Sequence, residues 1–459
     1  MAVLDWLLDS VALVLGLLHL FVARNFLYWK DKGVPHLHPR PLVGNLMSLV
    51  TLKDSPAVFL QRIHQAAGAH PYFGFFIFGR PALLVRDPNL LQNILVKDFA
   101  NFTDRVTSSD RLKDPVGAGN LFCLKGTRWR HIRTNVTPTF SSSRLKVMFW
   151  RILDSAQQTR DYILRKDNKT VDVKNFFTKA ILDSSCSTMF GIESRTLHNP
   201  LSEFRYYEKK IMRWTPYRAL EVLAHFFCPA LLDVLDARLF HRDSTTFLSR
   251  AFSESMSARE ESGIFRSDLV DTLVSLKKQE DEVLGQALLF FVAGSETTED
   301  IQMRLRSEIR NVLEHHKGKV TYEAVQDMKY LHMVVSGYVK TITLIFHNRM
   351  SLHDYCVPGT NLVIERGTPV YVSLLGLHRD PAYHDNPLKF DPERFSKDKN
   401  CVGLRLALLS VKVMLVVLLQ IFRVVLDEKT PVPLVLSPYV LFLKNIGQLP
   451  LQFVPDVHI

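Results

Sequence analysis

The feature that most constrains how this chain can fold is a single cysteine at the start of a long apolar segment. Cys401 is followed by Gly403 and then by residues 404–425, which are almost entirely apolar. A thiolate at the N-terminus of a buried helix can bind a metal, because that end stabilises an anion by roughly 0.3–1 kcal/mol. Gly403 has no Cβ and would let a flat ligand approach the backbone. The alternative is an inert core thiol, since cysteine is among the most buried residue types.

Composition and charge limit the classes to which the chain can belong. The 459 residues are 47% hydrophobic, and no interior linker or short repeat divides them, so we expect one large globular domain. The five cysteines form no CxxC pair, which argues against a disulfide scaffold or a zinc finger. The net charge of +11 suits nucleic acid, anionic lipid or an acidic protein. Because the basic residues are scattered and carry no nucleic-acid-binding motif, we expect no nucleic-acid partner.

The N-terminus predicts a membrane anchor. Residues 11–22 are nearly all apolar and residues 6–8 extend the run, which approaches the roughly 17–20 residues that span a bilayer. Basic residues follow on the C-terminal side and indicate a cytosolic body. Tyr28 and Trp29 are typical of the membrane interface. An apolar helix packed on the body is the alternative.

We therefore divide the chain into an anchor over 1–28, a proline-rich hinge over 29–45 and a body over 46–459. A second membrane span over 404–425 is disfavoured, because Arg405 and Lys412 interrupt that segment and leave a run more typical of a buried helix.

The body alternates between short strands and longer helices, which predicts a mainly α fold with small β-sheets (α+β). Strands are expected over 73–85, 348–369 and 369–377, with edge hairpins over 432–453. Helices are expected over 88–99, 126–136, 149–190, 301–315 and 322–339. A polar, irregular loop over 105–120 either selects substrates beside a pocket or is a plain surface loop.

Trp129 and Arg133 are the first candidate binding residues. They are four residues apart in the helix expected over 126–136, so they share one helical face. An indole N–H beside a guanidinium suits an anionic ligand group such as a propionate. A stacked pair on the surface is the alternative.

A second candidate site lies where an apolar helix turns polar. Gly294 inside this helix costs about 1 kcal/mol relative to alanine, which indicates a kink or the close approach of a ligand. Glu296 and Thr297 follow at the polar end. A carboxylate and a hydroxyl in a dry pocket can relay protons. Alternatively the helix ends at Gly294 and Thr297 caps the next one.

These features, in this order, resemble the cytochrome P-450 family of haem-thiolate monooxygenases, above all its microsomal, insect-type members. The resemblance covers nearly the whole chain, and the order and spacing of short motifs carry it. The motifs are W-x-x-x-R from Trp129, A-G-x-E-T from Ala293, F-x-P-E-R-F from Phe390 and C-x-G-x-R from Cys401.

The resemblance implies a cofactor site for haem b. Cys401 would be the proximal thiolate ligand of the iron, beside Gly403. Trp129, Arg133 and Arg349 would hold the haem propionates.

The resemblance also implies the reaction and its partners. Gly294 would lie over the distal haem face, and Glu296 and Thr297 would supply protons during oxygen activation. One oxygen atom would be inserted into a lipophilic small molecule. Electrons would come from NADPH through a membrane-bound reductase, on the cytosolic side of the endoplasmic reticulum membrane.

Three departures from the family pattern stand in this sequence. Gly337 and Lys340 replace the E-x-x-R pair, and lysine cannot make the bidentate fork of arginine. The glycine-rich loop that should precede Cys401 is missing, and the helix after Thr297 is cut short. The sequence therefore predicts missing segments near 300/301 and 400/401.

Two functions remain open on this evidence. The first is a haem-thiolate monooxygenase that acts on xenobiotics or endogenous lipids and hormones. The second is a catalytically inactive, haem-poor, membrane-anchored homologue or an incomplete gene product.

Overall fold

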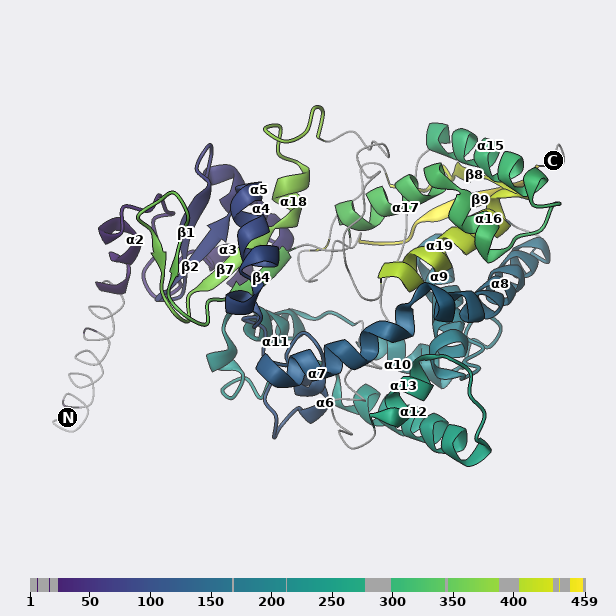
Figure 1. The fold of residues 1–459 in the computed structure, drawn as a ribbon, viewed down its shortest axis with the longest axis horizontal. Helices are drawn as coiled ribbons and strands as arrows, with labels where there is room; N and C mark the ends of the chain where they lie inside the picture. Colours follow the sequence, from purple (N-terminus) through teal and green to yellow (C-terminus); the bar gives the residue numbers. More distant parts are fainter. Residues whose placement is uncertain are drawn as a thin grey trace.

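A four-stranded sheet joins residues 72–85 to residues 346–373. In the computed structural model its order is β1-β2-β7-β4, with β1 and β2 antiparallel, β2 and β7 parallel, and β7 and β4 antiparallel. The strands are β1 (Tyr72–Ile77), β2 (Arg80–Val85), β7 (Pro369–Ser373) and β4 (Phe346–Met350). Figure 1 shows the sheet with helices α4 (Pro56–Ala66), α5 (Pro88–Gln92) and α18 (Leu374–His378) against it. The strand expected over 369–377 thus ends early, and α18 follows it directly.

The structure describes residues 6, 16, 24–166, 169–211, 213–276, 299–342, 346–387, 404–431, 437 and 446–456. The described short elements are α2 (Tyr28–Asp31), α3 (Met47–Val50), α6 (Pro115–Gly119), β5 (Tyr355–Cys356) and β6 (Val363–Ile364).

The remaining helices form a second, larger part of the molecule, on the right of Figure 1. They are α8 (Ser142–Leu164), α9 (Val173–Ser185), α10 (Glu203–Ile211), α12 (Arg242–Ser262), α13 (Leu269–Ser275), α15 (Glu299–His315), α16 (Tyr322–Asp327), α17 (Lys329–Ile342) and α19 (Leu404–Leu419). Helix α11 (Pro216–Phe227) lies instead against the four-stranded sheet, where the ring of Phe227 stacks on that of Tyr371 in β7 at 5.3 Å. The predicted mainly α fold with small sheets is confirmed. Val413 and Val416 of α19 are fully buried, as the prediction of a core helix over this segment requires.

A second sheet has the order β3-β9-β8, formed by β3 (Thr170–Asp172), β9 (Pro450–Pro455) and β8 (Phe422–Leu426). Strand β9 is its central strand and pairs antiparallel with both neighbours. The edge position expected for the described end of the tail is therefore wrong. No local pattern predicted β3, which interrupts the helix expected over 149–190.

Local signals placed some helices well and others poorly. Helix α7 (Gly126–Val136) has the predicted bounds. The helix expected over 88–99 ends as α5 at Gln92, continues as a π-helical turn to Lys97 and is followed by a 3-10 turn, Phe99–Phe102. The helix expected over 322–339 is two helices, because Met328 leaves the helical conformation at ψ 88°.

Trp29 does not lie at a membrane interface. Its side chain is fully buried and donates a hydrogen bond from Nε1 to the carbonyl of Phe75 in β1, at 3.2 Å. Gly74 makes room for it, since a Cβ there would lie 2.6 Å from the indole. The interfacial prediction for Trp29 is therefore wrong. Apart from 6, 16 and 24–28, the predicted anchor lies outside the described residues. In the part of the chain that is described, no helix has both the length and the apolar character to cross a membrane.

The junction at 300/301 lies inside α15, which runs from Glu299 to His315. Directly after it, Gln302 exchanges two hydrogen bonds with the backbone of Val424 in β8. Its Nε2 donates to the carbonyl at 3.0 Å, and its Oε1 accepts from the amide at 2.7 Å. The start of α15 is therefore fixed on the second sheet.

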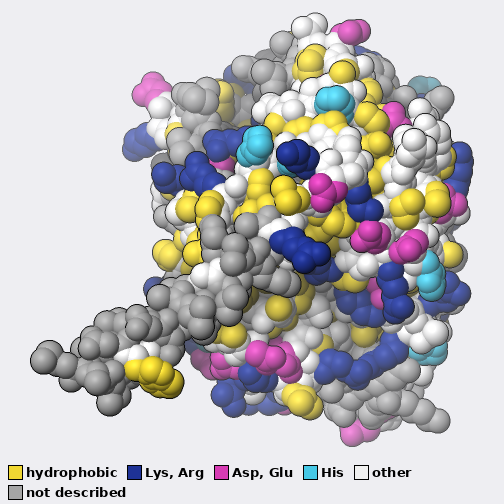
Figure 2. All heavy atoms as spheres, turned by 90° about the vertical axis from the view of Figure 1, so that its left-hand side faces the viewer, with side chains coloured by type: hydrophobic (Ala, Val, Ile, Leu, Met, Phe, Trp, Pro, Cys, Tyr) yellow, Lys and Arg dark blue, Asp and Glu magenta, His cyan; other side chains and the backbone are white. Residues whose placement is uncertain are grey.

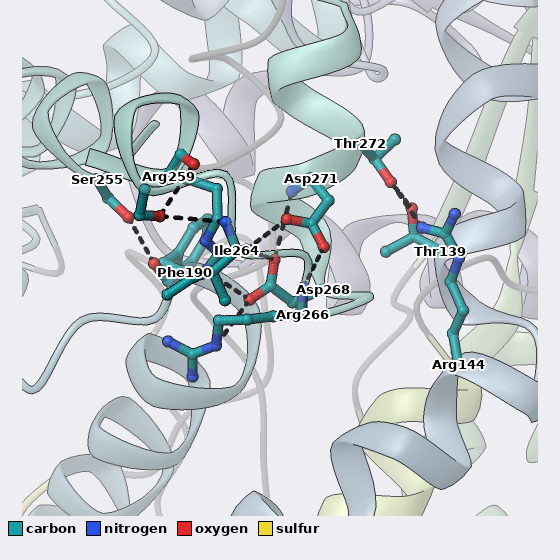
Figure 3. Close-up of polar contacts among 11 residues, drawn as sticks. Thr139, Arg144, Phe190, Ser255, Arg259, Ile264, Arg266, Asp268, Asp271 and Thr272 are labelled. Carbon is teal, nitrogen blue, oxygen red and sulfur yellow. Dashed lines mark hydrogen bonds and ion pairs between the residues drawn. The ribbon is translucent and has the colours of Figure 1, made fainter. Parts of the chain in front are cut away.

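A buried ion network holds α12 to α13, and two hydrogen bonds hold α13 to the turn after α7 and to α8 (Figure 3). Both terminal nitrogens of Arg259 in α12 donate hydrogen bonds to the carboxylate of Asp268, at 2.9 and 3.0 Å. Asp268 is fully buried. On the other side of α13, Thr272 hydrogen-bonds Thr139 at 2.7 Å and accepts from Arg144 at 3.1 Å. These contacts fix α13 against the turn that follows α7.

We expect Asp268→Asn to lower the free energy of unfolding by about 3 kcal/mol, because it removes one of the two buried carboxylates that pair with Arg259 and leaves only Asp271. Urea denaturation measures this. The matched control is Glu254→Gln, which removes an exposed pair with Arg250 at 3.8 Å and should cost less than about 1 kcal/mol. Equal losses in the two variants would contradict the importance of burial.

Candidate functional site

Helix α7 presents Trp129 and Arg133 one turn apart. On its other side, Ile132 and Val136 are fully buried in the main core, so the helix is held firmly in place. Trp129 is half-buried, and its ring lies 5.8 Å from the ring of Phe99 at a tilt of 55°.

Arg349 reaches the same region from the edge strand β4. Its Nη1 donates to the carbonyl of Thr103 at 3.0 Å, and its guanidinium lies 5.0 Å from the ring centroid of Phe99. Phe99 therefore contacts both Trp129 and Arg349 and links α7 to β4. Within the described part of the chain, the buried Nε of Arg349 has no hydrogen-bond partner.

Four cationic side chains act on one another here, and we call Arg105, Lys125, Arg133 and Arg349 the cationic cluster. Burial and, to a smaller extent, the positive charge of Arg133 together lower the pKa of Arg349 to about 10, against the opposing effect of Asp104. Burial likewise lowers the pKa of Lys125 to about 8, with Arg105 and Arg349 adding to the effect.

His347 lies two residues before Arg349 in β4, so the two side chains project from the same face of the strand. Burial lowers the pKa of His347 to about 3, and the charges of Arg105 and Arg349 contribute. The imidazole is therefore neutral at physiological pH.

The cluster suits an anionic ligand. Buried charges are costly unless they are paired, and a buried N–H without a partner loses the free energy of its hydrogen bond to water. An unpartnered guanidinium nitrogen beside further cations is relieved by a carboxylate. The two propionates of haem supply such groups, so the residues present fit this cofactor.

Several predicted site residues cannot be placed. Gly294, Glu296, Thr297, Cys401 and Gly403 all lie outside the described residues. Phe99 contacts both Trp129 and Arg349, and Arg133 acts on Arg349 through its charge. The roles proposed for these three residues stay predictions. Across the described ranges, no group of three or more His, Cys, Asp or Glu side chains could hold a metal ion.

Sequence reasoning missed Phe99, Arg105, Lys125 and His347. One signal was available, because Lys125 precedes Trp129 by four residues, just as Trp129 precedes Arg133. Nothing in the sequence indicated that Phe99 would contact Trp129 or that His347 would lie near Arg105 and Arg349.

One family model and several relatives match this chain along most of its length. A family model described as cytochrome P-450 matches residues 34–452. Cytochrome P-450 6l1 of Blattella germanica is 57% identical, over 99% of this chain and 98% of the relative. Cytochrome P-450 6k1 of the same organism is 39% identical, over 95% and 94%. Cytochrome P-450 6a2 of Drosophila melanogaster is 32% identical, over 97% and 98%.

The first of these alignments also bears on missing segments. Its 492 aligned positions exceed the 459 residues of this chain by 33. At least 33 positions of that relative therefore face gaps in this chain.

We expect the folded chain to lose stability in acid partly through His347. Its pKa is 6.5 when unfolded and about 3 when folded, so the unfolded state binds the extra proton as pH falls below 6.5. Between about pH 7 and about pH 4.5, the free energy of unfolding of His347→Leu should therefore fall by roughly 2 kcal/mol less than that of the wild type. Urea denaturation of the haem-free chain across this range measures the difference. The exposed His70→Gln variant is the control, and equal pH profiles for His347→Leu and the wild type would contradict the burial of His347.

Proposed function

The chain belongs to the cytochrome P-450 family, and from that premise we propose that it oxidises lipophilic small molecules, either xenobiotics or endogenous lipids and hormones. Members of this family are haem b monooxygenases that take NADPH-derived electrons through a reductase. The observation that supports the proposal in this chain is the cationic cluster with the unpartnered Nε of Arg349. It lies where the W-x-x-x-R motif meets β4.

We propose that Trp129, Arg133 and Arg349 hold the haem propionates. Helix α7 and strand β4 are separate elements, and Phe99 contacts a side chain from each. Arg349 is already positioned by Thr103, so it need not be reordered when the anion arrives. Cys401 would hold the iron beside Gly403, and the bound haem would supply the centre that activates dioxygen.

The other proposed roles rest on the family motifs. Glu296 and Thr297 would hold and move protons at the pocket, and Gly294 would leave room beside them. Gly294 suits this role because a glycine admits a close neighbour where any other residue would place a Cβ.

We propose that the chain acts at the endoplasmic reticulum membrane, with residues 1–28 as the anchor, 29–45 as the hinge and 46–459 as the body. Figure 2 shows hydrophobic side chains between Lys and Arg on the sheet side of the molecule. Leu27, just before the hinge, and Leu42, within it, are 48% and 54% exposed. Such mixed surfaces suit a lipid boundary.

The second candidate is an inactive, haem-poor homologue or an incomplete gene product. Gly337 and Lys340 in place of E-x-x-R favour it, as do the 33 or more gap positions against the first relative. By the family resemblance, the glutamate of E-x-x-R would pair with Arg394 of the F-x-P-E-R-F motif, and Gly337 removes that carboxylate. Removing one member of a buried charge pair typically costs about 3–5 kcal/mol.

The reduced, carbon-monoxide difference spectrum of the full chain separates these candidates. We expect a strongly red-shifted Soret band that Cys401→Ala abolishes, because a thiolate ligand changes the electronic structure of the haem iron. Cys356→Ala, at an exposed thiol, is the matched control and should keep the band. No haem band in the wild type would overturn the proposal and favour the second candidate.

Sequencing the transcript across 300/301 and 400/401 tests the incomplete-product reading. Extra coding sequence at either junction would support that reading. Uninterrupted junctions, together with the red-shifted band, would exclude it.

A further inference from the structure

Lys125 extends the W-x-x-x-R face by one turn toward the start of α7. It is the N-cap residue of the helix, so Lys125, Trp129 and Arg133 follow one another at intervals of four. Its ammonium donates to the carbonyl of Arg105 and to the carbonyl of Thr107, the latter at 2.7 Å. It therefore fastens the loop that precedes α7 to the helix that carries the candidate propionate ligands.

The same loop is fastened to β4. The amide of Met350 donates to the carbonyl of Asp104 at 2.9 Å, next to the bond from Arg349 to Thr103. The carboxylate of Asp104 accepts from the amide of Gly126 at 2.9 Å. Lys125 thus lies where residues 103–107, α7 and β4 meet.

This is a poor place for a lysine if stability alone is considered. The N-terminus of a helix repels a cation, and the cationic cluster repels it further. The charged groups that act on Lys125 are Asp104, which favours the ammonium, and Arg105 and Arg349, which disfavour it. The nearby thiol of Cys123 stays neutral, because burial raises its pKa to about 12. Burial is the largest influence and brings the pKa of Lys125 to about 8. An additional anion would offset this cost.

We propose that Lys125 is a positioning residue of the haem site, which clamps the 105–107 backbone to α7 and adds a titratable positive charge to the cluster that receives the propionates. This inference rests on the proposed function, since the anion is the haem carboxylate. Two carbonyls occupy two of the three N–H donors of the ammonium and leave one for the ligand.

Haem binding should depend on pH, because the bound anion changes the pKa of Lys125. A bound propionate raises the pKa of Lys125 above its haem-free value of about 8. Haem binding therefore takes up a proton above that pH. The contribution of Lys125 is complete below about pH 8 and is lost as pH rises through the pKa of the haem-bound state.

Hemin loss from the full chain to excess apomyoglobin, followed by Soret absorbance between about pH 6 and pH 10, tests the charge. The wild-type rate should be flat in acid and should rise above about pH 8. Lys125→Arg should hold hemin without that rise, because arginine stays protonated. Lys125→Met should lose hemin about tenfold faster at neutral pH, as expected for one charge-assisted hydrogen bond, and should not show the rise. Lys146→Met, at an exposed lysine paired with Glu323, should match the wild type.

Trypsin cleavage after Arg105 tests the clamp without any cofactor. Lys125→Met should be cut faster than the wild type at this bond, and Lys146→Met should not. Unchanged cleavage would overturn the clamp.

The two proposals fail in distinguishable ways. If the wild type retains no hemin, both the proposed function and the charge role of Lys125 fall. If the wild type retains hemin and Lys125→Met matches it in rate and pH profile, only the role of Lys125 falls. A rise that persists in Lys125→Arg would also overturn that role, and this variant decides the matter should Lys125→Met fail to fold.

Discussion

The pairing of β7 with both β2 and β4 is the constraint on which the site depends. It joins residues 80–85 to residues 346–373 in one sheet, so that Arg349 on the edge strand meets the loop that starts at Thr103. Parallel pairing of such distant segments is not encoded in either one alone, and closing so long a loop carries an entropic cost that the buried sheet must exceed. Once the sheet has formed, β4 and α7 are held close enough for Phe99 to contact a side chain from each.

How much was predictable follows from where each signal lies. Helix α7 was predictable from its own segment, although the carboxylate that accepts from its first amide belongs to Asp104, 22 residues before Gly126. Trp29 was not, because the carbonyl that accepts its hydrogen bond and the glycine that makes room for it belong to β1. The roles of Trp129 and Arg133 came from their spacing together with a family resemblance. Phe99 and His347 were missed because their relevance arises only when β4 reaches α7, which no local pattern records.

None of the three departures from the family pattern replaces a residue of the cationic cluster. Arg349 and Lys125, which we propose to act at the anion site, are present and are fixed by contacts of their own. By the family resemblance, the missing loop would form the shell around the thiolate, where hydrogen bonds and exclusion of water tune the metal. A chain can therefore keep the propionate site and still lose the ligand field that supports turnover. Haem retention and catalysis are separate properties here.

Local rules are broken most clearly where Lys125 caps α7. A lysine at a helix N-terminus, with guanidinium groups beside it and burial lowering its pKa to about 8, opposes the helix dipole, its neighbours and solvation together. Proteins accept such conflicts at functional sites, where a ligand removes them. Asp104 shows that the helix end already has a carboxylate on its first amide, so the capping requirement is met without Lys125. What the lysine adds is positive charge next to Arg349, and that addition is favourable only when an anion joins the cluster.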